Sequence, residues 1–320
     1  MNTREQLLAL NEELRRLKAD GRRTVSVSEE SLATLRATLA DEPDEAYADA
    51  PAPAGAVREA FVPTPSRQPE PTFAARAPVS APAPVAPKPA APLPAATFTL
   101  PEGDKATRWN ALREIVLNDK VCKEHIHPGK RVVFGVGSVE ASIMFVGEAP
   151  GGDEEDQGEP FVGRAGQLLN RMIKAMGLDR GQVYIGNILN WRPAMGARNA
   201  DGSQTGNRPP TTEEMAYCLP FIRAQIAIIQ PKVLVALGKT AVDGLLGSDR
   251  FKSMGAARGT WHEYAGTPLR ATYHPSYLLR QEGLVSAAAK KIKRDAWEDL
   301  LAVMERAQVP ISEKQRNYFL

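Results

Sequence analysis

A glycine-rich, acidic segment of the chain carries side chains of types that could do chemistry. It runs from Gly147 and Glu148 through four consecutive acids, Asp153 to Asp156, to Phe161, which follows a proline in polar surroundings. Carboxylates can exchange protons or bind metal ions, and an aromatic ring can stack on a flat ligand. A second acidic group with metal-ligand spacing does not accompany these acids, so the sequence disfavours a metal site here.

Further polar side chains follow other predicted strands. The acidic segment follows an apolar run that ends at Val146, Asn187 lies near the end of the next run, and His274 follows the last. Because the carboxyl ends of parallel strands meet at one edge of a sheet, we expect these side chains to converge. An amide can donate and accept at once, as the paired edge of a base requires, and a histidine could donate to a developing anion. Each could instead serve the fold, Asn187 by binding a loop carbonyl and Phe161 and His274 by packing.

The elements that must position these groups alternate along the chain. Apolar runs predict strands at 131–136, 142–146, 183–189, 233–237 and 269–273, and a short strand pair begins near 258–261. Helical spacing predicts helices at 106–117, 166–176, 212–230, 240–246 and 285–304, with the 147–163 segment left as a loop. This alternation is typical of the α/β class: a three-layer α/β/α sandwich with a mostly parallel central sheet.

Composition divides the chain into four parts. Residues 1–40 contain leucines at helical spacing, which predict short amphipathic helices that could dock on a protein partner or form a solvated arm. Residues 41–102 are rich in proline and alanine, with too few large apolar side chains to offset the entropy of ordering, and indicate a disordered linker. The predicted catalytic domain then spans 103–309, and 310–320 form a C-terminal tail.

Charge and cysteine content limit the class of protein. The net charge of +2 combines about −4 in residues 1–104 with about +6 in residues 105–320, so the folded part is only mildly basic. Two cysteines are too few for a disulfide framework and suit a reducing compartment. Since no apolar run reaches the length of a membrane span, we expect a soluble, cytoplasmic protein without membrane contact. We also expect a monomer.

Nucleotide hydrolysis is a weaker interpretation of the glycine-rich segments. Neither 147–151 nor Gly238-Lys239-Thr240 has the spacing of a phosphate-binding Walker loop. A nucleotide-binding regulator is therefore disfavoured.

Taken together, these motifs resemble the uracil-DNA glycosylase superfamily, most closely its type-4 branch. The resemblance is carried by residues 147–151 and 158–166, Asn187, Arg192-Pro193, Asn207-Arg208-Pro209 and 274–280, and it covers residues 121–304. It implies an enzyme of DNA repair that flips uracil out of single- or double-stranded DNA and hydrolyses its N-glycosidic bond, leaving an abasic site.

The resemblance also implies roles for individual residues. Phe161 would stack on uracil, Asn187 would read its N3 and O4 edge, and His274 would stabilise negative charge on the leaving base. Gly147, Glu148 and Ala149 would surround the base with backbone groups, and Glu154 matches a pocket acid. The residues expected to contact DNA are Ser276, Tyr277, Leu278, Arg280, Asn207 and Arg208, of which Tyr277, Leu278 or Arg280 would fill the gap left in the duplex.

Ala149 stands where well-known members of the superfamily hold a water-activating aspartate. Because alanine cannot act as a general base, the reaction would have to proceed by dissociative cleavage, with uracil leaving as an anion held by preorganised donors. Glu148 and Glu154 are both candidates to orient the water that then captures the sugar.

The chain departs from the type-4 pattern at a cofactor site. Family members usually hold a 4Fe–4S cluster on four cysteines, and here the four positions are Cys122, His125, Trp191 and Cys218. Such clusters usually require three or four thiolates. We therefore expect the cluster to be lost or altered, with Trp191 filling the space. The loop between Arg192 and Asn207 also looks longer than in the family.

Two functions of different class remain open at this point. The first is the glycosylase, and the alternative is a catalytically weak module of the same fold that binds DNA or a damaged base. The intact set of Asn187, Phe161 and His274 favours the enzyme.

Overall fold

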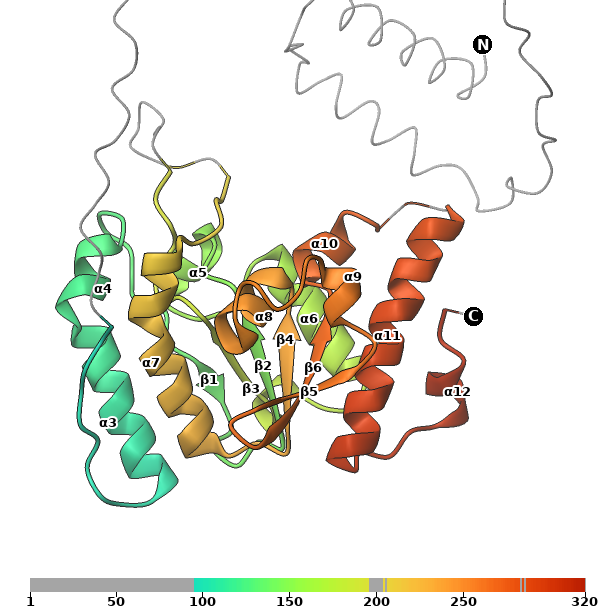
Figure 1. Cartoon of the computed structure of the whole chain (residues 1–320), viewed down its shortest axis with the longest axis horizontal. Coiled ribbons are helices and arrows are strands. Elements are labelled where there is room, and N and C mark those ends of the chain that lie inside the picture. Colours follow the sequence, from blue (N-terminus) through green and yellow to red (C-terminus); the bar gives the residue numbers. More distant parts are fainter. Residues whose placement is uncertain (1–94, 196–203, 205, 283, 285, 320) are drawn as a thin grey trace, which may run out of the picture. The chain divides into compact units, whose positions relative to one another are not determined.

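The computed structural model describes residues 95–319 apart from 196–203, 205, 283 and 285 (Figure 1). The predicted helices of residues 1–40 and the proline-rich segment up to residue 94 lie outside the described residues. Residues 95–102 lie against the folded core: the N–H of Ala96 donates to Tyr217 O at 3.3 Å, and the ring of Phe98 stacks on that of Phe221, 5.4 Å away.

A six-stranded sheet forms the centre of this part of the chain. Its strands are β1 (Val136–Gly137), β2 (Ile143–Gly147), β3 (Tyr184–Asn187), β4 (Val233–Leu237), β5 (Trp261–Tyr264) and β6 (Thr267–Thr272), in the order β1-β3-β2-β4-β6-β5. The four inner strands are parallel, and β1 and β5 pair antiparallel at the two edges. The predicted α/β class with a mostly parallel sheet is confirmed.

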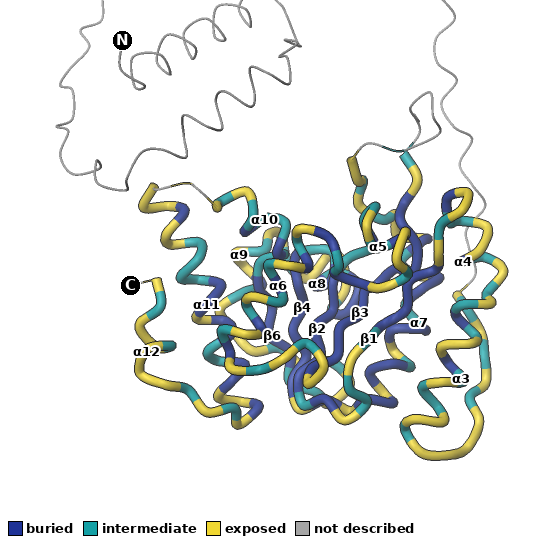
Figure 2. Tube along the Cα trace, turned by 180° about the vertical axis from the view of Figure 1, so that it is seen from behind, coloured by how far each residue is buried: buried dark blue, intermediate teal, exposed yellow. Residues whose placement is uncertain are grey.

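Helices cover both faces of the sheet. Helices α3 (Lys105–Asn118), α7 (Thr212–Ile229) and α8 (Lys239–Leu246) lie on one face, and α6 (Arg164–Ala175) and α11 (Ala287–Ala307) lie on the other. Successive side chains of β2 point to opposite faces, so Met144 belongs to the first core layer and Phe145 to the second. Figure 2 shows β2, β3 and β4 buried along their whole length, with exposed residues on the outer sides of the helices.

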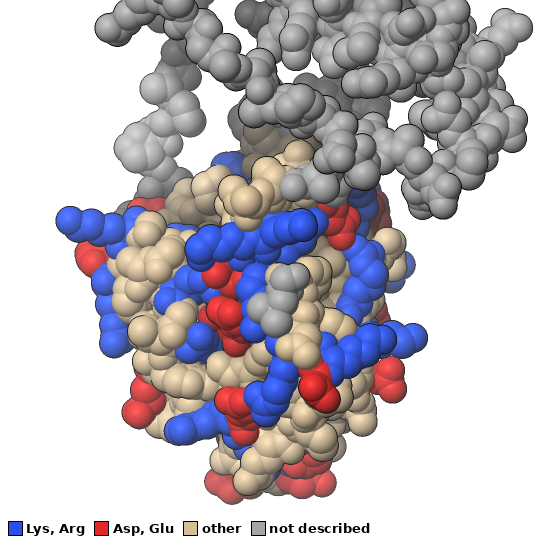
Figure 3. All heavy atoms as spheres, turned by 90° about the vertical axis from the view of Figure 1, so that its right-hand side faces the viewer, with Lys and Arg blue, Asp and Glu red and all other residues tan. Residues whose placement is uncertain are grey.

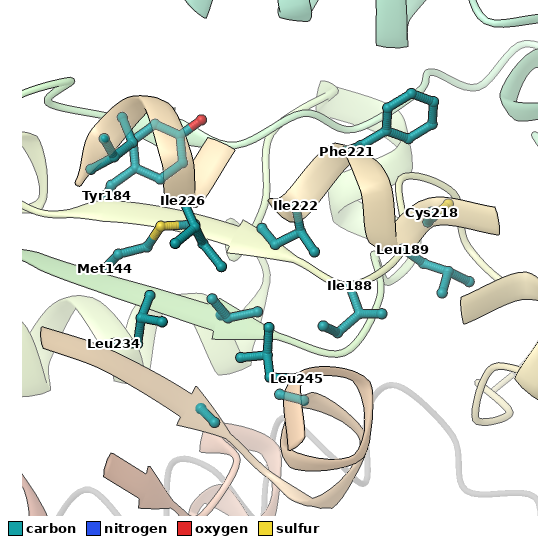
Figure 4. Packing of buried hydrophobic residues seen from close by; sticks show 14 of the residues in the cluster. Met144, Tyr184, Ile188, Leu189, Cys218, Phe221, Ile222, Ile226, Leu234 and Leu245 are labelled. Carbon is teal, nitrogen blue, oxygen red and sulfur yellow. The ribbon is translucent and has the colours of Figure 1, made fainter. Parts of the chain in front are cut away.

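The first core layer is built by α7 packing on β2 and β3. Figure 4 shows Ile222 and Ile226 of α7 among Met144, Ile188 and Leu234 of the strands and their exits. Thr211 begins the helix through a capping box, in which its Oγ1 accepts from the N–H of Glu214 at 3.2 Å. Each fully buried side chain of this size contributes about 1.5–3 kcal/mol by leaving water.

The remaining elements are short and several lie at the loop edge of the sheet. They are α4 (Lys120–His125), α5 (Gly152–Gln157), η1 (Arg180–Gln182), α9 (Met254–Ala257), α10 (Pro275–Leu279) and α12 (Glu313–Arg316). Helix α5 lies inside the segment predicted as a loop. Three of the four acids, Asp153, Glu154 and Glu155, occupy its first turn, where the helix dipole stabilises negative charge.

The first predicted strand is much shorter than expected. Of residues 131–136, only Val136 pairs in the sheet, because the preceding backbone groups bond elsewhere. The N–H of Arg131 donates to Glu155 O at 2.9 Å, and the N–H of Val133 donates to Asn190 O at 2.8 Å. This segment therefore ties α5 to the chain that leaves β3.

The C-terminal residues return to the second helical layer. The indole N–H of Trp297 donates to Gln315 O at 2.6 Å, and the rings of Trp297 and Tyr318 lie 5.2 Å apart. Figure 3 views the side that carries α11, where Lys and Arg side chains are interspersed with acidic ones. None of the helices in the described part of the chain combines the length and apolar character that a membrane crossing requires.

Candidate active site

A pocket of about 550 Å³ opens at the carboxyl ends of β2, β3, β4 and β6. Its lining brings together the predicted catalytic and base-binding residues Glu148, Ala149, Glu154, Phe161, Asn187 and His274. It also includes the predicted DNA-binding residues Asn207, Arg208, Ser276, Tyr277 and Arg280. Leu278 is not brought there, because it is 6% exposed and faces a separate apolar pocket beside Trp297.

Gly147 ends β2 beneath the pocket, and its lack of a side chain leaves room for two of the pocket's walls. A Cβ atom at this position would lie 2.4 Å from Asn187 Oδ1 and 2.5 Å from Cζ of Phe161. Both separations are far inside van der Waals contact, so a larger residue would displace the amide and the ring together. Gly147 also pairs with Asn187 across β2 and β3, which fixes the amide next to the ring.

Asn187 presents a buried amide to the pocket. The residue is 7% exposed, and its Oδ1 has no hydrogen-bond partner among the described residues. A buried polar atom left without a partner costs about 1–3 kcal/mol, so such atoms are rare and call for an explanation. Because Asn187 lines the pocket, a ligand with a donor group explains it.

Phe161 forms another wall with an unusual backbone. Its φ of 54° lies in the left-handed region, which bulky residues rarely adopt. Arg180 holds this conformation by donating to Phe161 O at 3.2 Å and to Pro160 O at 2.5 Å. Gly166 lies directly against the same peptide, since a Cβ there would be 1.9 Å from Phe161 O. The ring stands 5.6 Å from that of His274.

Glu154 fixes the loop on which Phe161 stands. Its Oε1 accepts from the N–H groups of Val162 at 3.1 Å and Gly163 at 3.0 Å, and its Oε2 accepts from Gly151 N–H at 3.0 Å. Both carboxylate oxygens are therefore engaged by backbone donors on either side of the ring. The geometry gives Glu154 a positioning role, although it lines the pocket.

His274 is held in one tautomer by the start of α10. The backbone N–H of Ser276 donates to Nδ1 at 3.2 Å, and the Ser276 hydroxyl lies 2.8 Å from the same atom. Since Nδ1 accepts, a neutral ring carries its proton on Nε2. Burial, followed by the positive charge of Arg280, lowers the pKa of His274 to about 4. The ring is then a neutral donor at physiological pH.

Glu148 differs from Glu154 in its partners. Its Oε2 accepts a hydrogen bond from the Thr240 hydroxyl at 2.7 Å, and burial raises the pKa of the carboxyl above its ordinary value. Oε1 of Glu148 is in no hydrogen bond with the described residues. Thr240 and its neighbour Lys239 also line the pocket, although the sequence analysis gave neither a role.

The cations at the pocket differ in how firmly they are engaged. Arg208 makes a paired contact with Glu214, with both N–O distances at 2.7 Å, so its guanidinium holds the loop to the start of α7. Lys239 pairs with Asp243 one turn along its own helix. Arg280 instead lies over the ring of Tyr277, 5.7 Å from its centroid.

A buried polar network behind the pocket is not predicted by the sequence pattern. Arg192, 8% exposed, donates from Nη1 to Glu155 Oε1 at 2.9 Å and from Nε to Asn207 Oδ1 at 2.8 Å. Glu155 in turn bonds His127 Nδ1 at 2.6 Å. Arg192 thereby orients the Asn207 amide at the pocket. The signal available in the sequence was the Arg-Pro motif itself.

Comparison with known proteins places this pocket in a family. The model of the uracil DNA glycosylase superfamily matches residues 134–301, which contain the whole pocket lining. The chain belongs to this superfamily. Its relatives include type-4 uracil-DNA glycosylases of Thermotoga maritima, 38% identical over 56% of this chain and 84% of the relative, and of Pyrobaculum aerophilum, 36% identical over 54% and 85%. A third, from Archaeoglobus fulgidus, is 38% identical over 53% of this chain and 83% of its own.

The predicted type-4 family is thus confirmed, and with it the enzyme class of uracil-DNA glycosylase hydrolases. The four positions expected to hold a cluster in such a glycosylase lie together beside α7. Cys122 and Cys218 are fully buried, and the rings of His125 and Trp191 lie 4.6 Å apart. The hydrogen bond with Cys218 and then burial raise the pKa of the Cys122 thiol, so it stays protonated. Two thiols, an imidazole and an indole do not fit a 4Fe–4S cluster.

Proposed function

We propose that this protein removes uracil from DNA by hydrolysing its N-glycosidic bond, with the pocket at the strand ends as the base site. The observation that carries the proposal is the buried amide of Asn187, whose Oδ1 lacks a partner among the described residues, beside the Phe161 ring. A flat base that brings an N–H donor would satisfy the amide and stack on the ring together. The names of the type-4 relatives support this substrate.

Asn187 would select uracil over cytosine through its hydrogen-bond pattern. Its Oδ1 would accept from uracil N3–H and its Nδ2 would donate to O4. Cytosine presents an acceptor at N3 and a donor at N4, so both contacts would be lost and two buried polar groups left unpartnered. Rejection by unpaired groups is stronger than rejection by shape alone.

His274 would stabilise the leaving base. With its proton on Nε2 and its pKa at about 4, it can donate a hydrogen bond to the negative charge that develops on uracil oxygen as the bond breaks. A neutral donor suits this task because it need not give up its proton. The backbone of Gly147, Glu148 and Ala149 would border the uracil. The Ala149 side chain cannot act as a general base.

Glu148 is the better candidate to orient the attacking water. The two oxygens of Glu154 already accept three backbone N–H groups, whereas Glu148 has one hydrogen bond from Thr240 and an oxygen to spare. The carboxylate would hold water for the sugar cation formed by dissociative cleavage. Glu148 thus acts in place of the aspartate that Ala149 replaces.

Arg280, Ser276 and Tyr277 would contact the DNA strand beside the flipped nucleotide, and Asn207 would approach from the opposite loop. We further propose that the protein acts as a monomer in the cytoplasm. A partner for the N-terminal arm stays a prediction, because that arm lies outside the described residues.

The experiment that tests the proposal is release of uracil from single- and double-stranded oligonucleotides, followed as alkali-labile abasic sites. We expect cleavage at uracil and no cleavage at cytosine. Asn187→Asp should lower cleavage at uracil strongly, because the new carboxylate repels O4, whereas Asn110→Asp on the exposed side of α3 should not. Retention of uracil-containing DNA without product would favour the binding module, and neither binding nor product would refute both.

A further inference from the structure

The four positions that would hold the family cluster form a compact group at one end of α7. We call Cys122, His125, Trp191 and Cys218 the plug. Cys122 and His125 lie on α4, Trp191 lies on the chain leaving β3, and Cys218 lies in the second turn of α7, beside Leu189 in Figure 4. The four positions lie together in space although they are far apart in the sequence. The fold therefore still brings the four ligand positions of the family cluster together.

The contents of that place are different from a cluster. The Cys122 thiol lies beside that of Cys218, and the His125 and Trp191 rings are tilted by 33° with centroids 4.6 Å apart. Tyr217 closes the group from α7, with its ring 6.2 Å from Trp191 and its hydroxyl 2.9 Å from Asp119 Oδ2. Trp191 is completely buried. Side chains thus fill the volume that iron and sulfide would need.

Hydrogen bonding does not explain the choice of tryptophan. Its indole N–H has no partner among the described residues, which costs about 1–3 kcal/mol. The ring must offset this cost by its large buried area and by contact with the two neighbouring rings. Its value to the fold is therefore its volume.

We propose that the plug is an iron-free replacement for the cluster, and that the protein folds and keeps its pocket without binding iron. The plug joins α4 and α7 to the exit of β3, four residues beyond Asn187 and next to Arg192. It thereby anchors the chain between Asn187, whose amide would read the base, and Arg192, which orients Asn207. A cluster would anchor the same segment.

The first test measures iron and acid-labile sulfide in the full-length protein, expressed with iron and sulfide supplied and purified without oxygen. We expect neither above background, no visible absorption, and a melting temperature that an iron chelator does not change. Stoichiometric iron and sulfide, or a melting temperature lowered by the chelator, would overturn the proposal. Anaerobic handling ensures that a low iron content does not result from oxidation.

The second test restores the missing thiols. The double variant His125→Cys with Trp191→Cys should bind iron and sulfide and gain visible absorption. Adding Cys218→Ser should abolish both the binding and the absorption. If the double variant folds but takes up no iron, then His125 and Trp191 are not the side chains that prevent cluster binding. If the variant fails to fold, the measurements on the unaltered protein decide alone. Neither test depends on glycosylase activity, so their failure is distinct from failure of the proposed function.

Discussion

The base pocket and the plug meet at the chain that leaves β3, but they differ in what occupies the space beside their buried polar atoms. Asn187 ends β3 and faces a pocket of about 550 Å³, whereas Trp191, four residues later, is completely buried beside the rings of His125 and Tyr217. Each holds a buried polar atom without a partner in the described part of the chain. The pocket has space for a molecule that could supply the partner, and the plug has filled its space with side chains.

This difference separates two uses of a retained site. In the pocket Phe161, Asn187 and His274, the side chains that the resemblance associates with the base, line one cavity and have types suited to the proposed chemistry. In the plug two of four ligand positions have changed, and what remains can serve packing but not cluster binding. The proposed enzyme would keep the chemistry of its family while packed side chains take the place of the cluster in holding the fold around it.

The largest expected effect lies in the plug. Trp191→Ala should lower the free energy of unfolding by about 3–5 kcal/mol, because it leaves a large cavity in the core. Urea unfolding followed by circular dichroism measures this loss. The matched control is Trp261→Ala on edge strand β5, where the ring is 39% exposed and should cost much less. Equal losses of unfolding free energy in Trp191→Ala and Trp261→Ala would contradict the packing role of the plug.

The next effect lies in the pocket and concerns rate. His274→Ala should slow single-turnover release of uracil by about 10²–10³-fold, as expected for loss of one donor to a developing anion. The unfolding free energy should change far less than in Trp191→Ala. His262→Ala removes a histidine outside the pocket lining and should leave the rate unchanged. A His274→Ala variant as fast as the parent would place the leaving-group donor elsewhere.

A smaller loss is expected from the stacking wall. Phe161→Leu keeps an apolar side chain but removes the flat face, and stacking on a base is worth about 1–3 kcal/mol. The measurement is kcat/KM on a uracil oligonucleotide, compared with Phe98→Leu, whose ring stacks on Phe221 and does not line the pocket. Activity unaffected by Phe161→Leu would show that the ring serves the fold alone.

The smallest expected effect is that of mild acid on the pocket. Since burial and Arg280 lower the pKa of His274 from 6.5 to about 4, the ring stays neutral as the pH falls from about 8 to about 5. The unfolded chain takes up its proton first, so the stability due to this ring is complete above about pH 6.5 and is lost as the pH falls toward about 4. Rates measured across this range on the parent and on His274→Gln isolate the histidine, and a midpoint near 6.5 would contradict a half-buried ring that stays neutral.

Much of this arrangement was predictable from the sequence because it depends on local pattern. Apolar runs marked the parallel strands, and polar residues at their ends marked the pocket, as with Asn187 and His274. Helix α5 was not predicted because its glycines and acids disfavour a helix interior, and its acids are stabilised by their place in the first turn and by partners distant in the sequence. Residues 131–135 look like a strand but bond to α5 and the β3 exit, which no local pattern reveals.

The roles of single side chains were harder to predict because partners are distant in the sequence. Glu154 was expected as a pocket acid, yet its oxygens are taken by backbone N–H groups up to nine residues away. The Arg192–Glu155 pair spans 37 positions, so the Arg-Pro motif marks Arg192 but no local pattern identifies its partner. Leu278 was expected at the DNA, but the short α10 turns it toward the core.

The backbone of Phe161 has a consequence for how a base would be received. A left-handed conformation at a bulky residue costs about 1–3 kcal/mol, and Arg180, Glu154 and Gly166 impose it while the chain folds. The ring is thus already in place before any nucleotide leaves its helix. The proposed enzyme would meet its substrate with a rigid receptor, so that binding energy is spared for opening the DNA rather than for reshaping the protein.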